Sequence, residues 1–381
     1  MNPDSSELGV SRPLIPPIFQ ASVYTIPDLD SLDRIMESKE PGFIYARDGQ
    51  PNAASLATKL AALHNAPWGL VTNAGMAAHA ACLLALTQHG DRVVASDKLY
   101  GRTSQLLQQE LSRFGVVTDW VDVTDVDAVR RALTESARVL LVETVSNPLL
   151  RVADLDALGD IAYSRGVKLV VDNTFATPVL VKPLDRNADL VVESLTKMIG
   201  GHSDLTLGFI AGEEDTLLPA LTQCVSIWGL AANPFDCWLA ERGLPTLELR
   251  MRTATANAAA LADWLDRRSG VLRVIYPGRR DHPDYALARK LMPDGAGNMI
   301  GLELDGGREA VNRFLRRANG IPFSPSLGHT ATTVSYPAGT SHRYVSPAER
   351  RRQGISDGLI RMSIGFEPLE QIQREVGRGL G

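Results

Sequence analysis

A lysine, an aspartate and a glycine-led turn stand where each could bind or react with a small anionic ligand. Lys197 follows the apolar stretch Leu190–Val192 and precedes a glycine pair, and the neighbouring Ser194 and Thr196 could donate hydroxyl hydrogen bonds to a phosphate. Lysines are normally solvated, so a lysine among hydroxyls and glycines directly after an apolar stretch is unusual. An exposed loop lysine is the alternative interpretation.

The aspartate and the turn are each ambiguous when taken alone. Asp172 ends an apolar stretch, where a carboxylate could cap the next turn, bind a metal or face a cationic ligand. No second Asp, Glu or His stands at a metal-ligand spacing from it, which disfavours the metal. Gly75 and Met76 lie where residues 71–78 change from a strand pattern to a helix pattern. The N–H groups of such a helix start can bind phosphate, although small residues also occur there for packing reasons alone.

Taken together, the three segments match the requirements of pyridoxal 5'-phosphate (PLP). This cofactor needs a primary amine for its aldehyde, a carboxylate for its pyridinium nitrogen and donors for its phosphate. We therefore expect Lys197 to hold PLP as a Schiff base and Asp172 to keep the ring nitrogen protonated. A charge-assisted hydrogen bond of the latter kind contributes about 1.5–3 kcal/mol. Lys197 must lose its proton to act as nucleophile and base, which burial and nearby cations would promote.

The elements that must position these residues alternate between strand-like and helix-like patterns from about residue 55 to 210. Such alternation predicts an α/β domain with a mostly parallel, seven-stranded sheet, whose ligands bind beyond the carboxyl ends of the strands. The expected strands are Trp68–Val71, Arg92–Ala95, Val116–Val121, Val139–Glu143, Lys168–Asp172, Leu190–Val192 and Thr206–Ala211. Helices are expected at Met76–Thr87, Val126–Thr134 and Asp154–Arg165.

The pattern changes near Pro245, and the 381 residues are too many for one ordinary core. We predict an N-terminal arm over residues 1–50, a large domain over 51–245 and a smaller α+β domain over 246–381. The smaller domain is expected to begin with a long helix over Thr246–Arg268. After it we expect strands at Leu272–Tyr276, Met299–Leu304 and Leu359–Ile364, and helices at Arg308–Arg317 and Leu369–Gly377.

Composition excludes several classes of protein. Hydrophobic residues make up 44% and charged residues 22%, and the net charge of −5 lacks the basic excess that nucleic acid or acidic lipid favours. Cys82, Cys224 and Cys237 show no C-x-x-C spacing, which favours reduced thiols and a cytoplasmic location over disulfides or zinc. No apolar stretch of about 18 residues predicts a membrane span, and Met1–Glu7 lacks the features of a signal peptide.

Over nearly its whole length the sequence resembles the Cys/Met-metabolism, or trans-sulfuration, enzymes of PLP fold type I. The motifs that carry the resemblance are Tyr45-Ala-Arg47 with Gly49-Gln-Pro51, Gly75-Met76, Tyr100-Gly-Arg-Thr103, Glu143-Thr-Val-Ser-Asn147-Pro148, Asp172-Asn-Thr-Phe175, Ser194-Leu-Thr-Lys197, Arg242 to Arg250, Ser326-Leu-Gly328, Pro337-Ala338, Thr340-Ser-His342, Gly354 to Asp357 and Arg361 to Glu367.

The resemblance implies roles for particular residues. Tyr100 is expected to stack on the pyridine ring and carry a proton near the leaving group. Arg361 would bind the substrate carboxylate bidentately, the geometry that a guanidinium suits best, assisted by Ser326 and Asn147. The phosphate would be held by Gly75, Met76, Ser194 and Thr196, and by Tyr45 and Arg47 of the neighbouring subunit.

A site shared in this way implies a homo-oligomer, most simply a dimer of dimers. His202 and His342 are expected to be structural hydrogen-bonding residues, and Cys82 to lie in the core.

The resemblance also implies elimination or replacement at Cβ or Cγ of a sulfur-containing amino acid or an activated homoserine. We expect γ-elimination of L-methionine to methanethiol, 2-oxobutyrate and ammonia. Ala331 stands where the family commonly has a glutamate, which disfavours the distal ammonium of cystathionine. Arg102 stands where methionine γ-lyases often have cysteine, and could indicate an anionic distal group. Cystathionine γ-lyase, cystathionine γ-synthase and O-acylhomoserine sulfhydrylase therefore remain alternatives, with an aminotransferase and a non-catalytic PLP sensor as rivals from other classes.

Overall fold

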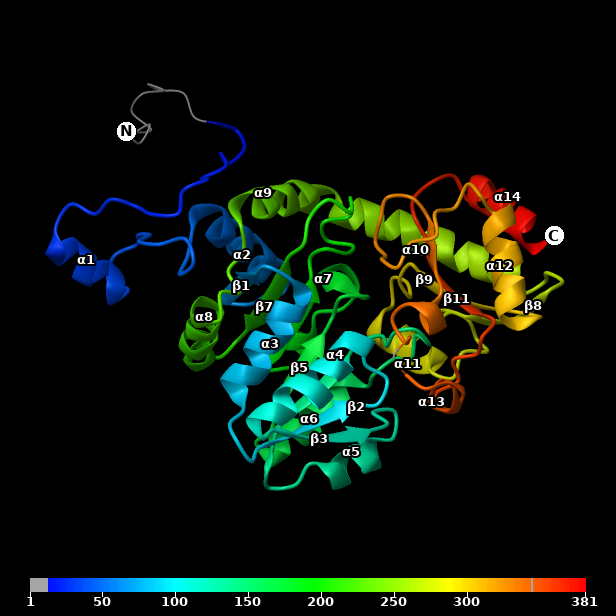
Figure 1. The fold of residues 1–381 in the computed structure, drawn as a ribbon, viewed down its shortest axis with the longest axis horizontal. Helices are drawn as coiled ribbons and strands as arrows, with labels where there is room; N and C mark the ends of the chain where they lie inside the picture. The colour runs from blue at the N-terminus through cyan, green and yellow to red at the C-terminus, as the bar shows by residue number, and fades with distance from the viewer. Residues whose placement is uncertain (1–12, 344) are drawn as a thin grey trace.

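The computed structural model describes residues 13–343 and 345–381, and two β-sheets organise this part of the chain (Figure 1). The larger sheet has the order β1-β7-β6-β5-β4-β2-β3, and its pairs are parallel except those made by β7. Its strands are β1 (Trp68–Thr72), β2 (Arg92–Ser96), β3 (Val117–Val121), β4 (Ala137–Glu143), β5 (Lys168–Asp172), β6 (Leu190–Ser194) and β7 (Gly208–Gly212).

Helices cover both faces of the larger sheet. Leu140 and Val142 of β4 belong to one hydrophobic cluster, while Leu141 between them belongs to another on the opposite face. Because successive strand residues point to opposite faces, a strand buried on both sides consists almost entirely of Val and Leu. The helices of this part are α2 (Pro51–Leu63), α3 (Gly75–Leu86), α4 (Gly101–Gln105), α5 (Val126–Ala132), α6 (Leu155–Arg165), α7 (Thr177–Leu180), α8 (Leu218–Ile227) and α9 (Pro234–Gly243).

The bounds of α6 show how local sequence signals position the site. The side chain of Asp154 accepts a hydrogen bond from the backbone N–H of Ala157 and caps the start of the helix. Gly166 ends the helix at φ +63°, a conformation that costs glycine little. The chain then reverses into β5, whose last residue is Asp172.

The smaller sheet is antiparallel, with the order β10-β11-β9-β8. The elements of this part are β8 (Val271–Ile275), β9 (Met299–Leu304), β10 (Thr333–Ser335), β11 (Leu359–Ser363), α11 (Tyr285–Leu291), α12 (Gly307–Arg317), α13 (Pro347–Arg352) and α14 (Leu369–Leu380). The long helix α10 (Leu247–Leu265) runs from the larger sheet to the smaller one (Figure 1). Leu247 and Met251 pack in the core beside the larger sheet, whereas Leu261 and Leu265 pack beside the smaller sheet.

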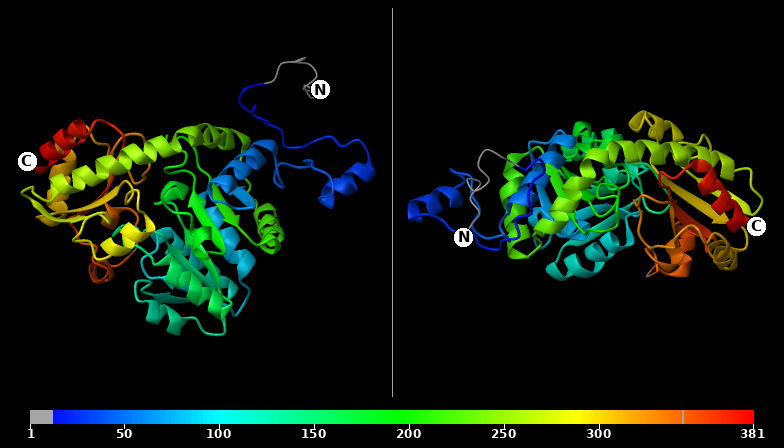
Figure 2. Two further views of the ribbon diagram at one scale, coloured as in Figure 1. Left: turned by 180° about the vertical axis from the view of Figure 1, so that it is seen from behind. Right: turned by 90° about the horizontal axis from the view of Figure 1, so that it is seen from above.

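The N-terminal segment lies apart from both sheets. Helix α1 (Leu29–Met36) projects away from the body in every view (Figure 1 and Figure 2). The preceding chain exposes large apolar side chains, with Leu14 fully accessible and Ile15 at 60%. The predicted arm also includes residues 1–12, which lie outside the described residues.

The predicted α/β architecture, with a mostly parallel seven-stranded sheet and a smaller α+β part, is confirmed. Each strand expected for the larger sheet corresponds to one that forms. The sequence interpretation missed β10, and it named no helix over Pro51–Leu63. Within the described residues, no helix has the length and apolar character needed to cross a membrane. Cys82, Cys224 and Cys237 are all buried and free.

Candidate active site

A cavity of about 510 Å³ opens beyond the carboxyl ends of β4, β5 and β6. Parallel strands end at the same edge of a sheet, so residues far apart in the sequence meet there. The predicted site residues that line this cavity are Gly75, Met76, Tyr100, Asn147, Asp172, Ser194, Thr196, Lys197 and Arg361.

The remaining predicted residues lie elsewhere. Ser326 stands beside the cavity, where its Oγ accepts a hydrogen bond from Lys197 Nζ at 3.0 Å. Tyr45 and Arg47 belong to the N-terminal segment and do not line the cavity of their own chain. The Arg47 guanidinium carbon lies 5.1 Å from the centroid of the Tyr45 ring. Their expected role in a neighbouring subunit stays a prediction.

One end of the cavity is suited to an anion. Helix α3 begins at Gly75, and the preceding Ala74 offers no side chain to cap its first N–H groups. A Cβ on Gly75 would lie 2.8 Å from Ser194 Cβ, so only glycine lets the helix start approach the end of β6 this closely. Free N–H groups at a helix start, beside a serine hydroxyl, form a site that can bind a phosphate.

Lys197 lies three residues beyond the end of β6. Burial, and then the positive charge of Arg361, lower the pKa of its amine. A lower pKa increases the fraction of neutral amine, which is the form that reacts with an aldehyde and can accept a proton. The position and the protonation state of Lys197 both suit a covalent bond to a carbonyl cofactor.

Asp172 is held from two sides at the end of β5. Its Oδ1 accepts a hydrogen bond from the backbone N–H of Thr174 at 2.9 Å, and its Oδ2 lies 3.2 Å from His79 Nε2 on α3. Burial would raise the pKa of Asp172, but His79 and Thr174 outweigh it and the pKa is lowered. The sequence analysis gave His79 no role, although it stands four residues after Gly75 and therefore on the same helix face.

Glu143 is a second residue whose role was missed. It lies opposite Asp172 in the register of β4 and β5 and is buried. Its Oε1 accepts a hydrogen bond from the backbone N–H of Tyr100 at 2.5 Å, and its Oε2 accepts one from Asn147 N–H at 3.0 Å. Burial, and then the nearby charge of Asp172, raise the pKa of Glu143 well above its ordinary value. Glu143 thus fixes the backbone of two residues that line the cavity.

Arg361 reaches the cavity from β11 in the smaller sheet and is 4% exposed. Its Nη1 donates to Asn147 Oδ1 at 2.6 Å, and its Nη2 donates to the Ser326 carbonyl at 3.4 Å. Its Nε is buried and has no hydrogen-bond partner among the described residues. Burial lowers the pKa of Arg361 to about 10. A buried guanidinium with an unused donor is suited to a carboxylate ligand.

Arg102 and Arg343 also line the cavity. The segments that carry them touch, because a Cβ on Gly101 would overlap the Ser341 carbonyl oxygen. Apart from Glu143 and Asp172, none of the described lining residues is acidic. Ala331, which the sequence analysis placed near the distal end of the substrate, is not one of the lining residues.

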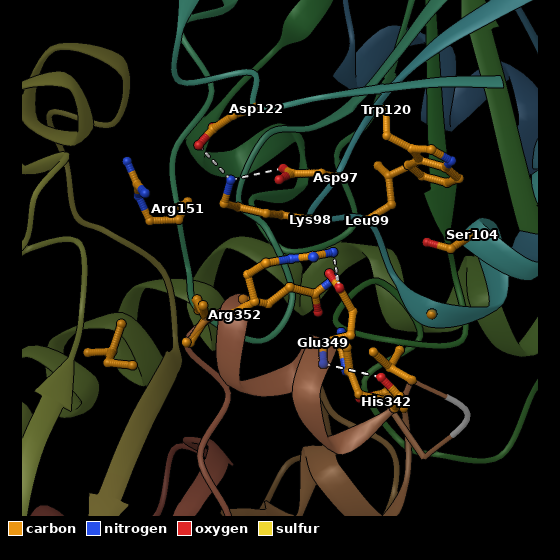
Figure 3. Close-up of a pocket in the computed structure, with 18 of the residues that line it drawn as sticks. Asp97, Lys98, Leu99, Ser104, Trp120, Asp122, Arg151, His342, Glu349 and Arg352 are labelled. Atoms are coloured by element: carbon orange, nitrogen blue, oxygen red, sulfur yellow. Dashed lines mark hydrogen bonds and ion pairs between the residues drawn. The ribbon is translucent and has the colours of Figure 1, made fainter.

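A larger cavity, of about 1170 Å³, is lined by other residues of these two segments, among them Gly101 and His342. Figure 3 shows this larger cavity. None of the predicted site residues lines it. Its lysine and its arginines are paired with carboxylates. Lys98 lies 2.9 Å from Asp97 and 2.8 Å from Asp122, and the arginine pairs are Arg151 with Asp284, Arg273 with Glu303 and Arg352 with Glu349. The lysine and arginine side chains of this cavity thus already have carboxylate partners.

The wall between the two cavities is thin. Along one segment, Gly101 faces the larger cavity while Tyr100 and Arg102 face the smaller one. Along the other, His342 faces the larger cavity and Arg343 the smaller one. Burial, and then the charge of Arg361, lower the pKa of His342 to about 4, which agrees with the structural role expected for this residue.

The donor set of the smaller cavity fits PLP. A half-buried amine, a strand-end carboxylate and a helix start with free N–H groups surround one space. The glycine at the helix start leaves room that a side chain would fill.

Comparison with known proteins agrees with this geometry. A family model described as Cys/Met metabolism PLP-dependent enzyme matches residues 3–381. The chain is 37% identical over 368 residues to an L-methionine gamma-lyase of Fusobacterium nucleatum subsp. nucleatum, covering 96% of this chain and 92% of that protein. It is 35% identical over 363 residues to an O-succinylhomoserine sulfhydrylase of Pseudomonas aeruginosa, covering 95% and 90%.

A solved structure is similar over the same extent. The cystathionine gamma synthase of Xanthomonas oryzae pv. oryzae, crystallised with aminoacrylate and cysteine, superposes with a TM-score of 0.91 at 36% identity. The superposition covers 96% of this chain and 92% of that one. The fold type I architecture expected from the sequence is thereby confirmed.

Proposed function

The chain belongs to the Cys/Met-metabolism family of PLP-dependent enzymes, and from this premise we propose that it catalyses γ-elimination of L-methionine to methanethiol, 2-oxobutyrate and ammonia. It is a PLP-dependent carbon–sulfur lyase. The observation that carries the proposal is one cavity in which the half-buried amine of Lys197 and the guanidinium of Arg361 lie beside the carboxylate of Asp172.

The cofactor would be held at its aldehyde carbon by Lys197, at its phosphate and at its ring nitrogen. Bound PLP supplies an aldehyde that an amine can attack and an electron sink for negative charge at Cα of the substrate. Ser194 and the N–H groups at the start of α3 would bind its phosphate, and Asp172 its ring nitrogen. Thr196 contributes by holding the loop: its hydroxyl donates to the Leu207 carbonyl at 3.3 Å and accepts from Leu207 N–H at 3.1 Å.

The chain's own residues would then bind the substrate and move protons. Arg361 would bind the substrate carboxylate through Nε and one Nη, with Asn147 fixing the guanidinium plane. Lys197, whose lowered pKa favours the neutral amine, would remove the Cα proton. Tyr100, which lines the cavity and is 36% exposed, would supply a proton to the departing sulfur.

One observation favours a second candidate. Arg102 and Arg343 line the cavity, and the side chain of methionine has no anionic group that either could bind. A substrate with an anionic γ-substituent, such as O-succinylhomoserine, would gain Coulomb attraction from both side chains. The second candidate is therefore elimination or thiol replacement on an O-acylhomoserine, with cystathionine as a third.

The active form is proposed to be a homo-oligomer, most simply a dimer of dimers. The N-terminal segment exposes large apolar side chains, among them Leu14, Ile15 and Val23, which a second copy of the chain could bury. Tyr45 and Arg47 in this segment would then contact the phosphate bound in the neighbouring subunit.

A substrate panel with product identification tests the reaction. Holoenzyme is supplied with L-methionine, L-cystathionine, or O-succinylhomoserine with and without a thiol. We expect methanethiol and 2-oxobutyrate from methionine, and none of these products from the Lys197→Ala variant. If O-succinylhomoserine turned over much faster than methionine, and the Arg102→Gly variant lost this activity but still accepted methionine, the second candidate would replace the first.

A further inference from the structure

His79 is a buried histidine at the back of the proposed cofactor site. It lies on the second turn of α3 and is 5% exposed. Its Nδ1 lies 3.0 Å from the Gly75 carbonyl oxygen, and its Nε2 lies 3.2 Å from Asp172 Oδ2. The same helix therefore offers its N-terminus to the phosphate end of the cavity and this imidazole to the carboxylate end.

The two contacts determine where the protons of His79 can be. A carbonyl oxygen only accepts hydrogen bonds, so Nδ1 carries a hydrogen and donates it to Gly75. The remaining proton lies between Nε2 and the carboxylate of Asp172. The pKa of His79 is raised, because Asp172 outweighs the effect of burial, and the pKa of Asp172 is lowered. Both directions describe an imidazolium–carboxylate pair.

We infer that His79 is a positioning residue that fixes the orientation of the Asp172 carboxylate and places a positive charge behind it. This inference rests on the proposed pairing of Asp172 with the cofactor ring nitrogen. The carboxylate has room for three donors, namely His79 Nε2, Thr174 N–H and the ring N–H. With the first two in place, its rotation is restricted before the cofactor binds.

The surroundings of His79 contain few competing charges. Asp172 on β5 contacts the His79 imidazole directly. Glu143 on β4 lies next to Asp172 in the strand register. Lys197 after β6 and Tyr100 before α4 line the same cavity. Cys82, on the same helix as His79, lies close to Cys224 on α8. Burial raises the pKa of both thiols and keeps them uncharged.

Two substitutions separate orientation from charge. His79→Gln keeps a neutral N–H donor near the position of Nε2, whereas His79→Leu removes both the donor and the charge. We expect His79→Leu to weaken PLP binding about tenfold, the loss of one hydrogen bond to a charged group. His79→Gln should bind PLP within about threefold of the unaltered protein, because the orienting hydrogen bond is retained.

The visible absorbance of the bound cofactor, followed against pH, reports the charge. Removing a positive charge stabilises the protonated form of the bound chromophore, so its midpoint should move to higher pH by about one unit in both variants. An unmoved midpoint in His79→Gln would overturn the cationic state of His79. Unchanged PLP affinity in His79→Leu would overturn its orienting role.

Two further variants complete the test. His64 is also buried beside a carboxylate, with Nε2 3.1 Å from Glu193 Oε2, but neither residue lines the cavity. His64→Gln should lower thermal stability without moving the absorbance midpoint of the bound cofactor. If His64→Gln moved the midpoint as much as His79→Gln, the shift would not be specific to His79 and the inference would be overturned. Asp172→Asn tests the premise that Asp172 binds the cofactor ring nitrogen. If this variant binds PLP normally and shows the normal absorbance midpoint, the proposed function fails. If it is impaired while the His79 variants behave like the unaltered protein, only the inference about His79 fails.

Discussion

Burial and a cationic neighbour act in the same direction on Lys197. Both lower the pKa of its amine, and Arg361 is the neighbour responsible. The same guanidinium is itself deprived of water, with an unused Nε donor that a substrate carboxylate could bind. Arg361 therefore favours the neutral form of the Lys197 amine, while its own positive charge stays available for the carboxylate of an amino-acid substrate.

Replacing Lys197 with alanine removes the amine that would bond to the cofactor. We expect the visible absorbance to be lost and turnover to fall by about a thousandfold or more, because the variant lacks both nucleophile and base. Absorbance spectra and steady-state rates measure the two effects. Lys182→Ala is the control, since Lys182 is partly exposed, lies outside the cavity and donates a hydrogen bond to Asn65. A variant at position 197 that still shows the visible band would contradict the assignment.

Arg361 should set the pH at which the free protein captures PLP. In Arg361→Leu the positive neighbour is gone, so the pKa of Lys197 rises and a higher pH is needed to obtain neutral amine. The midpoint of the capture rate against pH, measured by stopped-flow absorbance, should therefore move upward. Arg361→Lys keeps the charge and should keep the midpoint, while kcat/KM falls because the bidentate geometry is lost. A downward shift in Arg361→Leu would be inconsistent with this account.

At the scale of secondary structure, the contact between the start of α3 and the end of β6 requires glycine. In Gly75→Ala the added Cβ would lie 2.8 Å from Ser194 Cβ, and the helix start must move. We expect PLP affinity to fall at least about tenfold, because the N–H groups no longer converge on the phosphate. Equilibrium titration of the apo-protein measures it. Gly377→Ala on α14 is a matched control: its Cβ meets only Trp264, at 3.7 Å, and should be tolerated.

Sequence patterns predicted the elements better than the contacts between them. The central strands β4, β5 and β6 were visible because strands buried on both faces contain continuous Val and Leu stretches. The three residues of β10 are too few to form a pattern. Helix α2 was missed although Pro51 stands at its first position, where proline is favoured.

The same limit applies to the site. Lys197 and Asp172 were found because they follow apolar stretches that end in the cavity. His79 and Glu143 could not be given roles, because these depend on which strands and helices lie next to each other. Nothing in the sequence near His79 indicates that α3 packs against the end of β5.

At the scale of the whole molecule, α10 connects the two sheets without a flexible linker. Its first half packs with the larger sheet and its second half with the smaller one. Arg361 from the smaller sheet therefore has a defined position relative to Lys197. The division at residue 245 stays a prediction, and it falls just before this helix.

Mixing two inactive variants tests whether the N-terminal segment completes a neighbouring site. Arg47→Ala retains Lys197, and Lys197→Ala retains the segment, so a hybrid dimer would contain one complete site. Co-refolding the two should restore up to about a quarter of the activity if subunits assort randomly, as expected for a shared site in a symmetric dimer. Each variant refolded alone is the control. No recovery, with hybrids demonstrated by tagged purification, would place Arg47 at the site of its own chain.

The segments Tyr100–Arg102 and Ser341–Arg343 contribute lining residues to both cavities. A shift of either segment would enlarge one cavity and reduce the other. A ligand that fills the larger cavity and shifts either segment would therefore be expected to change the space around Tyr100 and Arg102 in the smaller one.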